Sequence, residues 1–219
     1  MNIFRTVLVA AMGAAFASAA SATVISFVGT PTSGEGLTTT ISAATVVTFN
    51  EGSALPSGIT YSGAGKILGG SKDGYYATPA GDNSLYLSVA YPDSTGTEIA
   101  QLGSQYNYFG LYWGSMDDYN TLSFYNGDKL LNSYTGAQVI ANGTALGDQS
   151  AMGSNRYVNF FFGPETYNKV VFDTKGFAFE SDNHAYANVS VPEPGTLALM
   201  AVGLLGAALT ARRRKLKAQ

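Results

Sequence analysis

The sequence contains no cysteine, only one histidine, and few charged residues, which make up 12% of its 219 positions. Without thiols, the chain can form no disulfide framework, no thiolate metal site and no cysteine nucleophile. The single histidine, His184, cannot build a nitrogen-ligated zinc site alone, and no G-x-S-x-G element accompanies it for a serine triad. We therefore interpret His184 as a polar loop or strand-end residue that forms hydrogen bonds.

The charged residues are unevenly distributed along the chain. Six of the 12 basic residues lie near the two ends. Between Thr23 and Val191, six basic residues stand against fourteen acidic ones, which leaves a net charge of −8 for that region. A negative field of this size repels phosphates and acidic polymers, so we expect no nucleic acid partner.

Residues 1–22 have the three parts of a secretory signal peptide. One cation precedes an apolar stretch, and a run of small residues follows it. Ala20 and Ala22 fit the A-x-A rule of signal peptidase, so we expect cleavage after Ala22, with Ala19 and Ala20 as alternatives. The mature chain is then expected to be exported.

The region 23–190 has the composition of an all-β domain. Glycine, tyrosine and phenylalanine are abundant, with 26, 14 and 12 copies in the whole chain, and turn residues separate the apolar runs. Residues 85–89 and 157–161 alternate in apolar and polar character, as half-buried strands do. About ten such strands predict two packed antiparallel sheets, a jelly-roll-like β-sandwich, with a barrel as the alternative.

This prediction is specific about several segments. Residues 138–141 are expected to form a strand, and the Thr-, Ser- and Gly-rich residues 30–42 a loop. No helix longer than about three turns is expected between Thr23 and Ser190. Trp113 is expected to be buried between the two sheets.

An aromatic strand, residues 108–113, offers candidate ligand-binding side chains. Alternation puts Trp113 with two other apolar residues on one face of the strand and Tyr112 on the other. The face with Trp113 suits the core. We therefore predict that Tyr112, together with Tyr119 after the strand, is an exposed ring that can stack on a sugar.

Clustered Asp and Asn residues leave a weak calcium site open. The predicted ligands are Asp117, Asp118 and Asp182, since calcium takes oxygen ligands and is plentiful outside cells. The alternative is that these residues lie in turns, where Asp and Asn bond their own backbone. The sequence has no D-x-D-x-D-G loop, and no other cofactor is expected.

The C-terminal residues 191–219 fall into three parts. Pro192, Glu193 and Pro194 hold the backbone extended. An uncharged stretch at about 196–211 follows, and as a helix it reaches about 25 Å, just enough to span the core of a bilayer. A basic cluster then ends the chain, and it is expected to stay in the cytoplasm and fix the orientation of the helix. The cluster comprises Arg212, Arg213, Arg214 and Lys215.

This arrangement resembles the PEP-CTERM sorting signal, the tail of proteins that are substrates of the membrane enzyme exosortase. The resemblance covers Val191 to about Lys217. It implies processing near Pro192 to Pro194, with exosortase and signal peptidase as partners. It also implies an intermediate held in the inner membrane by a transmembrane helix, followed by delivery to the cell surface or the extracellular matrix.

A second resemblance concerns the central domain. Segments 108–127 and 176–185 are similar to a β-domain shared by exosortase-dependent surface proteins, a resemblance that spans most of residues 85–191. It implies a fold and a destination but no catalytic residues. We expect a non-enzymatic surface or matrix protein associated with extracellular polysaccharide. The alternative is a secreted carbohydrate-active enzyme, which a cleft holding two carboxyl groups would favour.

Overall fold

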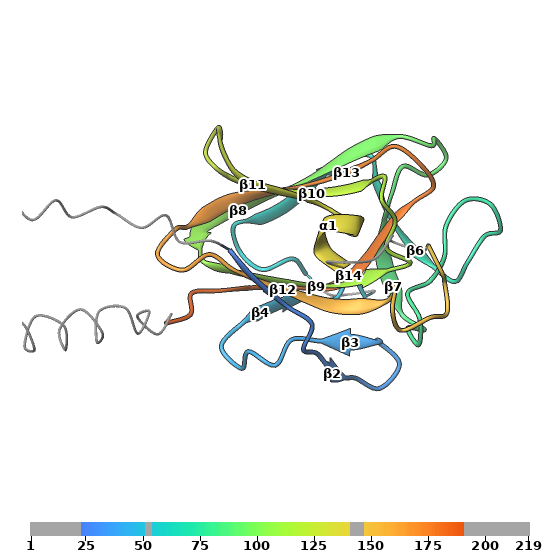
Figure 1. Cartoon of the computed structure of the whole chain (residues 1–219), viewed down its shortest axis with the longest axis horizontal. Coiled ribbons are helices and arrows are strands. Elements are labelled where there is room, and N and C mark those ends of the chain that lie inside the picture. Colours follow the sequence, from blue (N-terminus) through green and yellow to red (C-terminus); the bar gives the residue numbers. More distant parts are fainter. Residues whose placement is uncertain (1–22, 51–53, 141–146, 191–219) are drawn as a thin grey trace, which may run out of the picture.

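The computed structural model describes residues 23–50, 54–140 and 147–190, and two packed antiparallel sheets dominate it (Figure 1). The larger sheet contains β1 (Val24–Ser26), β4 (Thr45–Val47), β6 (Gly65–Gly69), β7 (Leu85–Val89), β9 (Tyr108–Gly114), β12 (Arg156–Phe161) and β14 (Phe179–Ala187). Its strands lie in the order β1-β12-β9-β14-β7-β6, and β4 also pairs with β14. Strand β14 therefore lies at the centre of the sheet.

The second sheet has five strands. They are β5 (Ile59–Gly63), β8 (Gly96–Tyr106), β10 (Asn120–Asn126), β11 (Lys129–Thr135) and β13 (Tyr167–Thr174). They lie in the order β11-β10-β13-β8-β5, and every pairing is antiparallel. The predicted β-sandwich is confirmed.

The main core fills the space between the two sheets. Trp113 of β9 has no exposed surface and stacks on Phe179 of β14, with the ring centroids 4.6 Å apart. Phe109, Phe124 and Phe172 join them from three different strands. Aromatic rings bury large apolar areas, so this cluster supplies much of the driving force for folding. The prediction that Trp113 is buried between the sheets is confirmed.

A thin third layer covers the outer face of the larger sheet. It is the hairpin of β2 (Thr30–Pro31) and β3 (Leu37–Thr38), which Figure 1 shows on the side of β9, β12 and β14 away from the five-stranded sheet. Tyr112 and Tyr157 lie beneath it in a second apolar cluster. Gly36 has φ 64° and comes so close that a Cβ there would collide with the Tyr112 ring. The segment expected to be a loop thus contains a hairpin that completes the fold.

The strand predicted for residues 138–141 is wrong, because α1 (Gly136–Ile140) occupies most of that segment. Thr135 Oγ accepts a hydrogen bond from the Gln138 N–H at 3.3 Å, and Gln138 Oε1 accepts one from the Thr135 N–H at 2.9 Å. This reciprocal pair is a capping box that starts a helix. Val139 anchors the helix in the main core. The helix has five residues, so the described ranges contain no helix longer than three turns, as predicted.

His184 lies in the core rather than in a loop or at a strand end. Its side chain has no exposed surface, and its ring stacks on Phe172 with the centroids 4.9 Å apart. Its two ring nitrogens lie 2.8 Å from the Tyr61 hydroxyl and 2.9 Å from the Ser181 hydroxyl. Burial lowers the pKa of His184 to about 3, so the ring is neutral near pH 7. The expected hydrogen-bonding role holds, but in the interior.

The burial of His184 predicts a loss of stability on acidification. In the unfolded chain His184 takes up a proton below about pH 6.5, whereas the folded protein resists this until about pH 3. Between pH 7.5 and 4.5 the wild-type protein should lose about 2–3 kcal/mol relative to His184→Gln, which keeps polar groups but does not titrate. Urea unfolding of both proteins at the two pH values measures this difference. If the two proteins lose the same stability between pH 7.5 and 4.5, His184 takes up its proton in the folded state as readily as in the unfolded chain.

Candidate binding site

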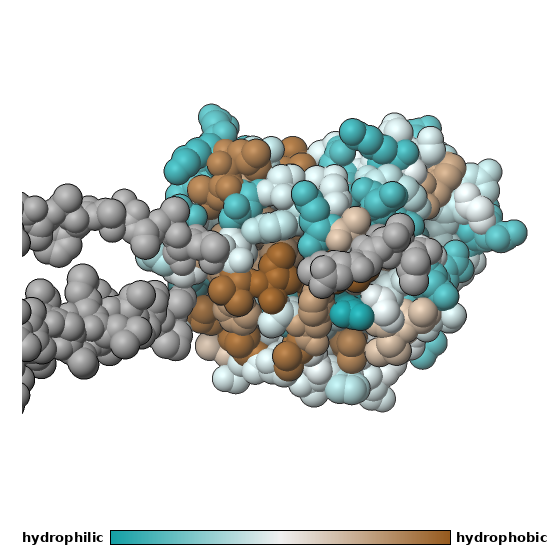
Figure 2. All heavy atoms as spheres, in the orientation of Figure 1, coloured by the Kyte–Doolittle hydropathy of each residue, from teal (hydrophilic) through white to brown (hydrophobic). Residues whose placement is uncertain are grey.

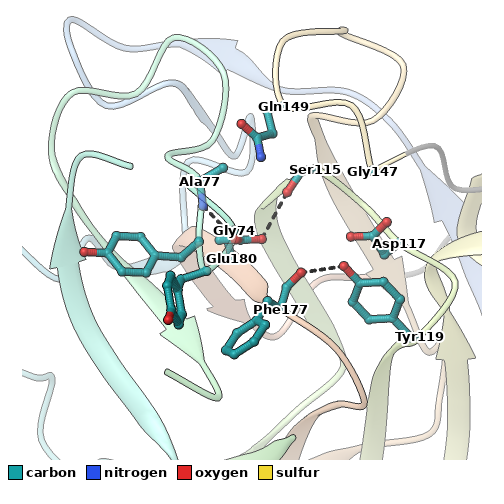
Figure 3. Close-up of a pocket in the computed structure, with 11 residues that line it drawn as sticks. Gly74, Ala77, Ser115, Asp117, Tyr119, Gly147, Gln149, Phe177 and Glu180 are labelled. Atoms are coloured by element: carbon teal, nitrogen blue, oxygen red, sulfur yellow. Dashed lines mark hydrogen bonds between the residues drawn. The ribbon is translucent and has the colours of Figure 1, made fainter. Parts of the chain in front are cut away.

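A hollow of about 310 Å³ lies among the loops that connect the strands. Figure 3 shows the residues that line it. Four segments meet around it: the loop before β7, the turn between β9 and β10, the loop before β12, and the residues that lead into β14. It is lined by Gly74, Tyr75, Tyr76, Ala77, Ser115, Asp117, Tyr119, Gly147, Gln149, Phe177 and Glu180. Aromatic, carboxyl, hydroxyl and amide groups thus share one concave surface.

Glu180 lies at the base of the hollow and joins two of its walls. Its carboxyl group accepts a hydrogen bond from the Ala77 N–H at 2.9 Å and another from the Ser115 hydroxyl at 3.0 Å, as Figure 3 shows. Only 2% of the residue is exposed. Burial raises the pKa of Glu180 to about 8, although the two hydrogen bonds act in the opposite direction. The carboxyl group is therefore protonated near neutral pH.

The buried side chain of Asn155 connects the loops that form the hollow. Its side-chain oxygen accepts hydrogen bonds from the Ala80 and Ser115 N–H groups, both at 3.0 Å. Its amide nitrogen donates to the backbone oxygens of Asp148 and Ala151, at 2.8 and 3.0 Å. Asn155 itself has no exposed surface. Because one buried amide satisfies four backbone groups, it fixes three separate loops relative to one another.

Asp117 and Tyr119 line the hollow from the turn between β9 and β10. The Tyr119 hydroxyl donates a hydrogen bond of 2.6 Å to the Phe177 carbonyl oxygen, which joins the β9–β10 turn to the segment before β14. Burial, together with the nearby charge of Asp118, raises the pKa of the Asp117 carboxyl group. Gly147, at φ 57°, approaches Asp117 so closely that a side chain at this position would displace the carboxyl group.

Beside the hollow, the rings of Tyr75, Tyr91 and Phe177 pack together, and we call this group the aromatic ridge. Tyr75 packs edge-on against Phe177 and Tyr91, with centroids 5.1 and 5.7 Å away. The Lys72 ammonium lies 4.5 Å from the centre of the Tyr75 ring and donates a hydrogen bond of 2.9 Å to the Tyr91 hydroxyl. Tyr75 is 39% exposed despite its size. The ridge is therefore a rigid aromatic surface that solvent can reach.

The structure places the residues predicted to face a ligand in different environments. Tyr119 lines the hollow and is partly exposed, and its contact with a sugar stays a prediction. Tyr112 does not face solvent: it has no exposed surface, because the hairpin β2–β3 covers that face and the Tyr112 hydroxyl donates to the Ala80 carbonyl oxygen. The alternation argument assigned Tyr112 to the correct face but could not foresee that a third layer covers it.

The predicted calcium ligands are also dispersed. Asp117 lines the hollow, Asp118 is exposed, and Asp182 is buried on β14. Across residues 23–50, 54–140 and 147–190, no group of three or more His, Cys, Asp or Glu side chains is placed to hold a metal ion. Asp117 and Asp118 are adjacent in a turn, so their side chains lie in different surroundings. Asp182 is on strand β14, far from this turn in the sequence.

The sequence reasoning missed most residues that build the hollow, notably Lys72, Tyr75 and Asn155. A turn signal at Asp73-Gly74 followed by two consecutive tyrosines is the one local pattern that could have drawn attention to this loop. Two adjacent tyrosines cannot both lie on the buried side of a strand. The role of Asn155 depends on contacts between distant segments and leaves no local pattern.

A second, more open hollow of about 290 Å³ is lined by Phe27, Leu37 and residues 152–153 and 155–157. Its lining is largely apolar, and Arg156 stacks 5.0 Å above the Phe27 ring there. Figure 2 shows several apolar patches on the visible face, and the exposed large apolar side chains include Val24, Val28 and Met152. The hollow described first holds more diverse chemical groups and is the stronger candidate site.

The protonated state of Glu180 predicts a specific effect of Glu180→Gln. Folding must keep Glu180 neutral, so the wild-type protein loses stability as pH rises from about 4.5 to 8, whereas the glutamine variant does not. The two proteins should have similar stability at pH 4.5, and the variant should be about 2–4 kcal/mol more stable at pH 7.5. Chemical unfolding at both pH values measures this, with the exposed Glu165→Gln as the control. A variant that is less stable at pH 7.5 would show that Glu180 is charged there.

The two predicted terminal elements lie outside the described residues. They are the signal peptide with its cleavage residues Ala20 and Ala22, and the tail with its helix at about 196–211 and its basic cluster from Arg212 to Lys215. Within the part of the chain that the structure describes, no helix is long and apolar enough to cross a membrane.

Comparison with known protein families identifies the tail. Residues 190–215 match the family described as the PEP-CTERM protein-sorting motif. The match includes Pro192, Glu193 and Pro194. It covers nearly the same residues as the resemblance noted in the sequence, which extends from Val191 to about Lys217. No curated protein matches the chain, so the family match rests on the tail alone. The protein carries a PEP-CTERM sorting motif, the signal of exported proteins that exosortase sorts to the cell surface.

Proposed function

We propose that the domain is a non-enzymatic surface or matrix module that associates with a neutral extracellular polysaccharide. The observation that carries this proposal is the hollow beside the aromatic ridge. Sugars present apolar faces and polar edges, so a site that binds them combines aromatic rings with a few fixed polar groups. Tyr75, Tyr76 and Tyr119 provide the rings, and Gln149 and Asp117 provide polar groups at the rim.

The rigidity of the ridge supports a binding role. Tyr75 is held between Phe177, Tyr91 and the Lys72 ammonium, so it loses little conformational freedom when a ligand stacks on it. The loops behind it are fixed by buried hydrogen bonds of Asn155 and Glu180. A site that is already formed before binding converts more of its contact energy into affinity.

The charge of the domain argues for a neutral ligand. The region from Thr23 to Val191 carries a net charge of −8, which repels acidic polymers. Near neutral pH the protonated Glu180 adds no charge inside the hollow. The Lys72 side chain is already engaged with the two tyrosine rings, so it contributes more to the shape of the ridge than to anion binding.

A second candidate function is glycoside hydrolysis, which one observation favours. Asp117 and Glu180 both line the hollow, and a protonated Glu180 has the state that a general acid needs. Against this, both Glu180 oxygens already accept hydrogen bonds from Ala77 and Ser115, and the residue is almost fully covered. These contacts suit a residue that fixes loops, so we favour the binding role.

We propose that the tail is a sorting signal that is removed, rather than a permanent membrane anchor. Signal peptidase would remove residues 1–22, and the helix at about 196–211 would hold the protein in the inner membrane. The extended Pro192 to Pro194 peptide could then enter the exosortase site, since a continuous helix would hide its main chain. Cleavage there would release the domain to the cell surface or the extracellular matrix.

The binding proposal predicts that Tyr75→Ala weakens glycan binding about three- to tenfold without loss of folding, because one stacking ring is removed. A glycan array of neutral polysaccharides, followed by titration of the best ligand with the full chain, measures this. Tyr125→Ala is the matched control: Lys169 Nζ lies 4.7 Å from the centre of the Tyr125 ring, but Tyr125 is on β10 of the five-stranded sheet and does not line the hollow. Equal weakening in both variants would contradict a site at the hollow.

The same protein samples separate the two candidate functions. Incubation of the bound glycan with the wild-type chain should release no reducing ends, whereas a hydrolase should release them and lose this activity in Asp117→Asn. Release of sugar that depends on Asp117 would replace the binding proposal by the enzymatic one.

The tail proposal predicts that Glu193→Ala leaves membrane insertion unchanged but blocks later processing, because residue 193 precedes the predicted span. Removal of Arg212 to Lys217 should instead disturb retention in the membrane. Mass measurement of the surface protein from wild-type cells and from cells without exosortase tests both expectations. If residues 197–219 persist in the mature protein from both strains, the tail is only an anchor.

A further inference from the structure

A pair of acidic side chains that do not line the hollow lies buried on the outer side of the larger sheet. Asp182 of β14 and Asp82 of the loop before β7 have 0% and 4% of their surface exposed. Asp82 Oδ1 accepts hydrogen bonds from the Ser84 N–H at 2.8 Å and from the Ser84 hydroxyl at 2.6 Å. The same hydroxyl lies 3.4 Å from Asp182 Oδ2. One serine thus connects the two carboxyl groups.

The other oxygen of each carboxyl group has no hydrogen-bond partner among the described residues. These atoms are Asp82 Oδ2 and Asp182 Oδ1, and both are buried. Buried polar atoms in proteins are almost always paired, so two unpaired oxygens on neighbouring carboxyl groups require an explanation. Either a proton shared between the two carboxyl groups, which lie within hydrogen-bonding reach of each other, or a bound cation would satisfy both oxygens at once.

The protein itself supplies no such cation in the described ranges. The single ion pair there joins Lys169 to Asp128. Glu35, which pairs with Asp82 in an isolated β-bridge, adds a third acidic group and raises the pKa of Asp182 further. Burial and the neighbouring Asp82 raise that pKa to about 9. Two adjacent carboxylates in a dry interior must share a proton or bind a cation.

We propose that Asp82 and Asp182 bind a calcium ion, with the Ser84 hydroxyl as a further oxygen donor. Calcium takes carboxylate, hydroxyl, carbonyl and water oxygens in flexible arrangements, and a site with two carboxylates suits the weak affinity of extracellular modules, about 10⁻⁴–10⁻³ M. The ion ties the loop before β7 to the central strand. Through the bridge between Asp82 and Glu35 it also holds the hairpin β2–β3 in place.

The test is calcium-dependent stability of the full chain in detergent, after treatment with EDTA. Addition of 10 mM CaCl₂ should raise Tm by about 5 °C, since ligand that binds only the folded state stabilises it. The same concentration of MgCl₂ should have a much smaller effect, because magnesium demands a stricter geometry. Isothermal titration with CaCl₂ should give a single weak site.

Asp82→Asn and Asp182→Asn should each abolish the calcium response while the protein stays folded in EDTA, because the substitution removes a buried charge without changing the shape of the side chain. Asp118→Asn is the matched control, since this exposed aspartate lies outside the pair and should leave the response intact. No rise in the wild-type Tm with CaCl₂ would overturn the proposal and indicate a shared proton. So would an equal loss of response in Asp118→Asn.

Discussion

The fold depends on how five consecutive polar residues are buried in its central strand. All nine residues of β14 are buried, and Glu180, Ser181, Asp182, Asn183 and His184 form its middle. Burying polar groups is unfavourable unless each finds a hydrogen-bond partner. The surrounding loops, the outer hairpin and the core provide most of these partners, and Asp182 Oδ1 is the exception. The candidate binding site and the acidic pair are both consequences of this constraint.

A β-bulge decides which of these side chains face the core. The pairing of β14 with β9 shifts between Asp182 and Ala185, and Asn183 has φ 51°. The extra residue allows Asp182 and Asn183 to lie on the outer side in succession, so that His184 returns to the core. Asn183 then donates to the backbone oxygens of Glu35 and Leu37, at 2.7 and 3.1 Å. The bulge therefore fixes the hairpin on the outside and the imidazole on the inside at once.

The sequence allowed the β-sandwich and the buried Trp113 to be predicted, because strand alternation is a local signal that burial reinforces. The centre of β14 was missed, since a run such as Glu180 to His184 reads as a turn when its distant partners are unknown. The helix α1 was missed for a different reason: its capping residues Thr135 and Gln138 are visible in the sequence, but the apolar residues that follow suggested a strand.

The candidate site was harder to predict than the fold. Tyr119 and Asp117 were selected from the turn after the aromatic strand, and both line the hollow. Tyr75 and Asn155 come from loops with no periodic pattern, and their positions follow from contacts between segments far apart in the chain. The sorting motif of the tail could be recognised from the sequence, because its parts are contiguous and need no contacts between distant segments.

The buried groups of β14 also determine how the protein responds to pH. His184, whose pKa burial lowers to about 3, disfavours the folded state as pH falls below 6.5. Glu180, whose pKa burial raises to about 8, disfavours it as pH rises above 4.5. Between pH 4.5 and 6.5 the folded protein keeps one proton on Glu180 and the unfolded chain keeps one on His184, so these two effects cancel. Asp182 is the third titratable group of this strand, and burial raises its pKa to about 9. Without a bound cation, its proton is kept only by the folded protein above about pH 4, so the folded state becomes less stable as pH rises from 4.5 to 6.5.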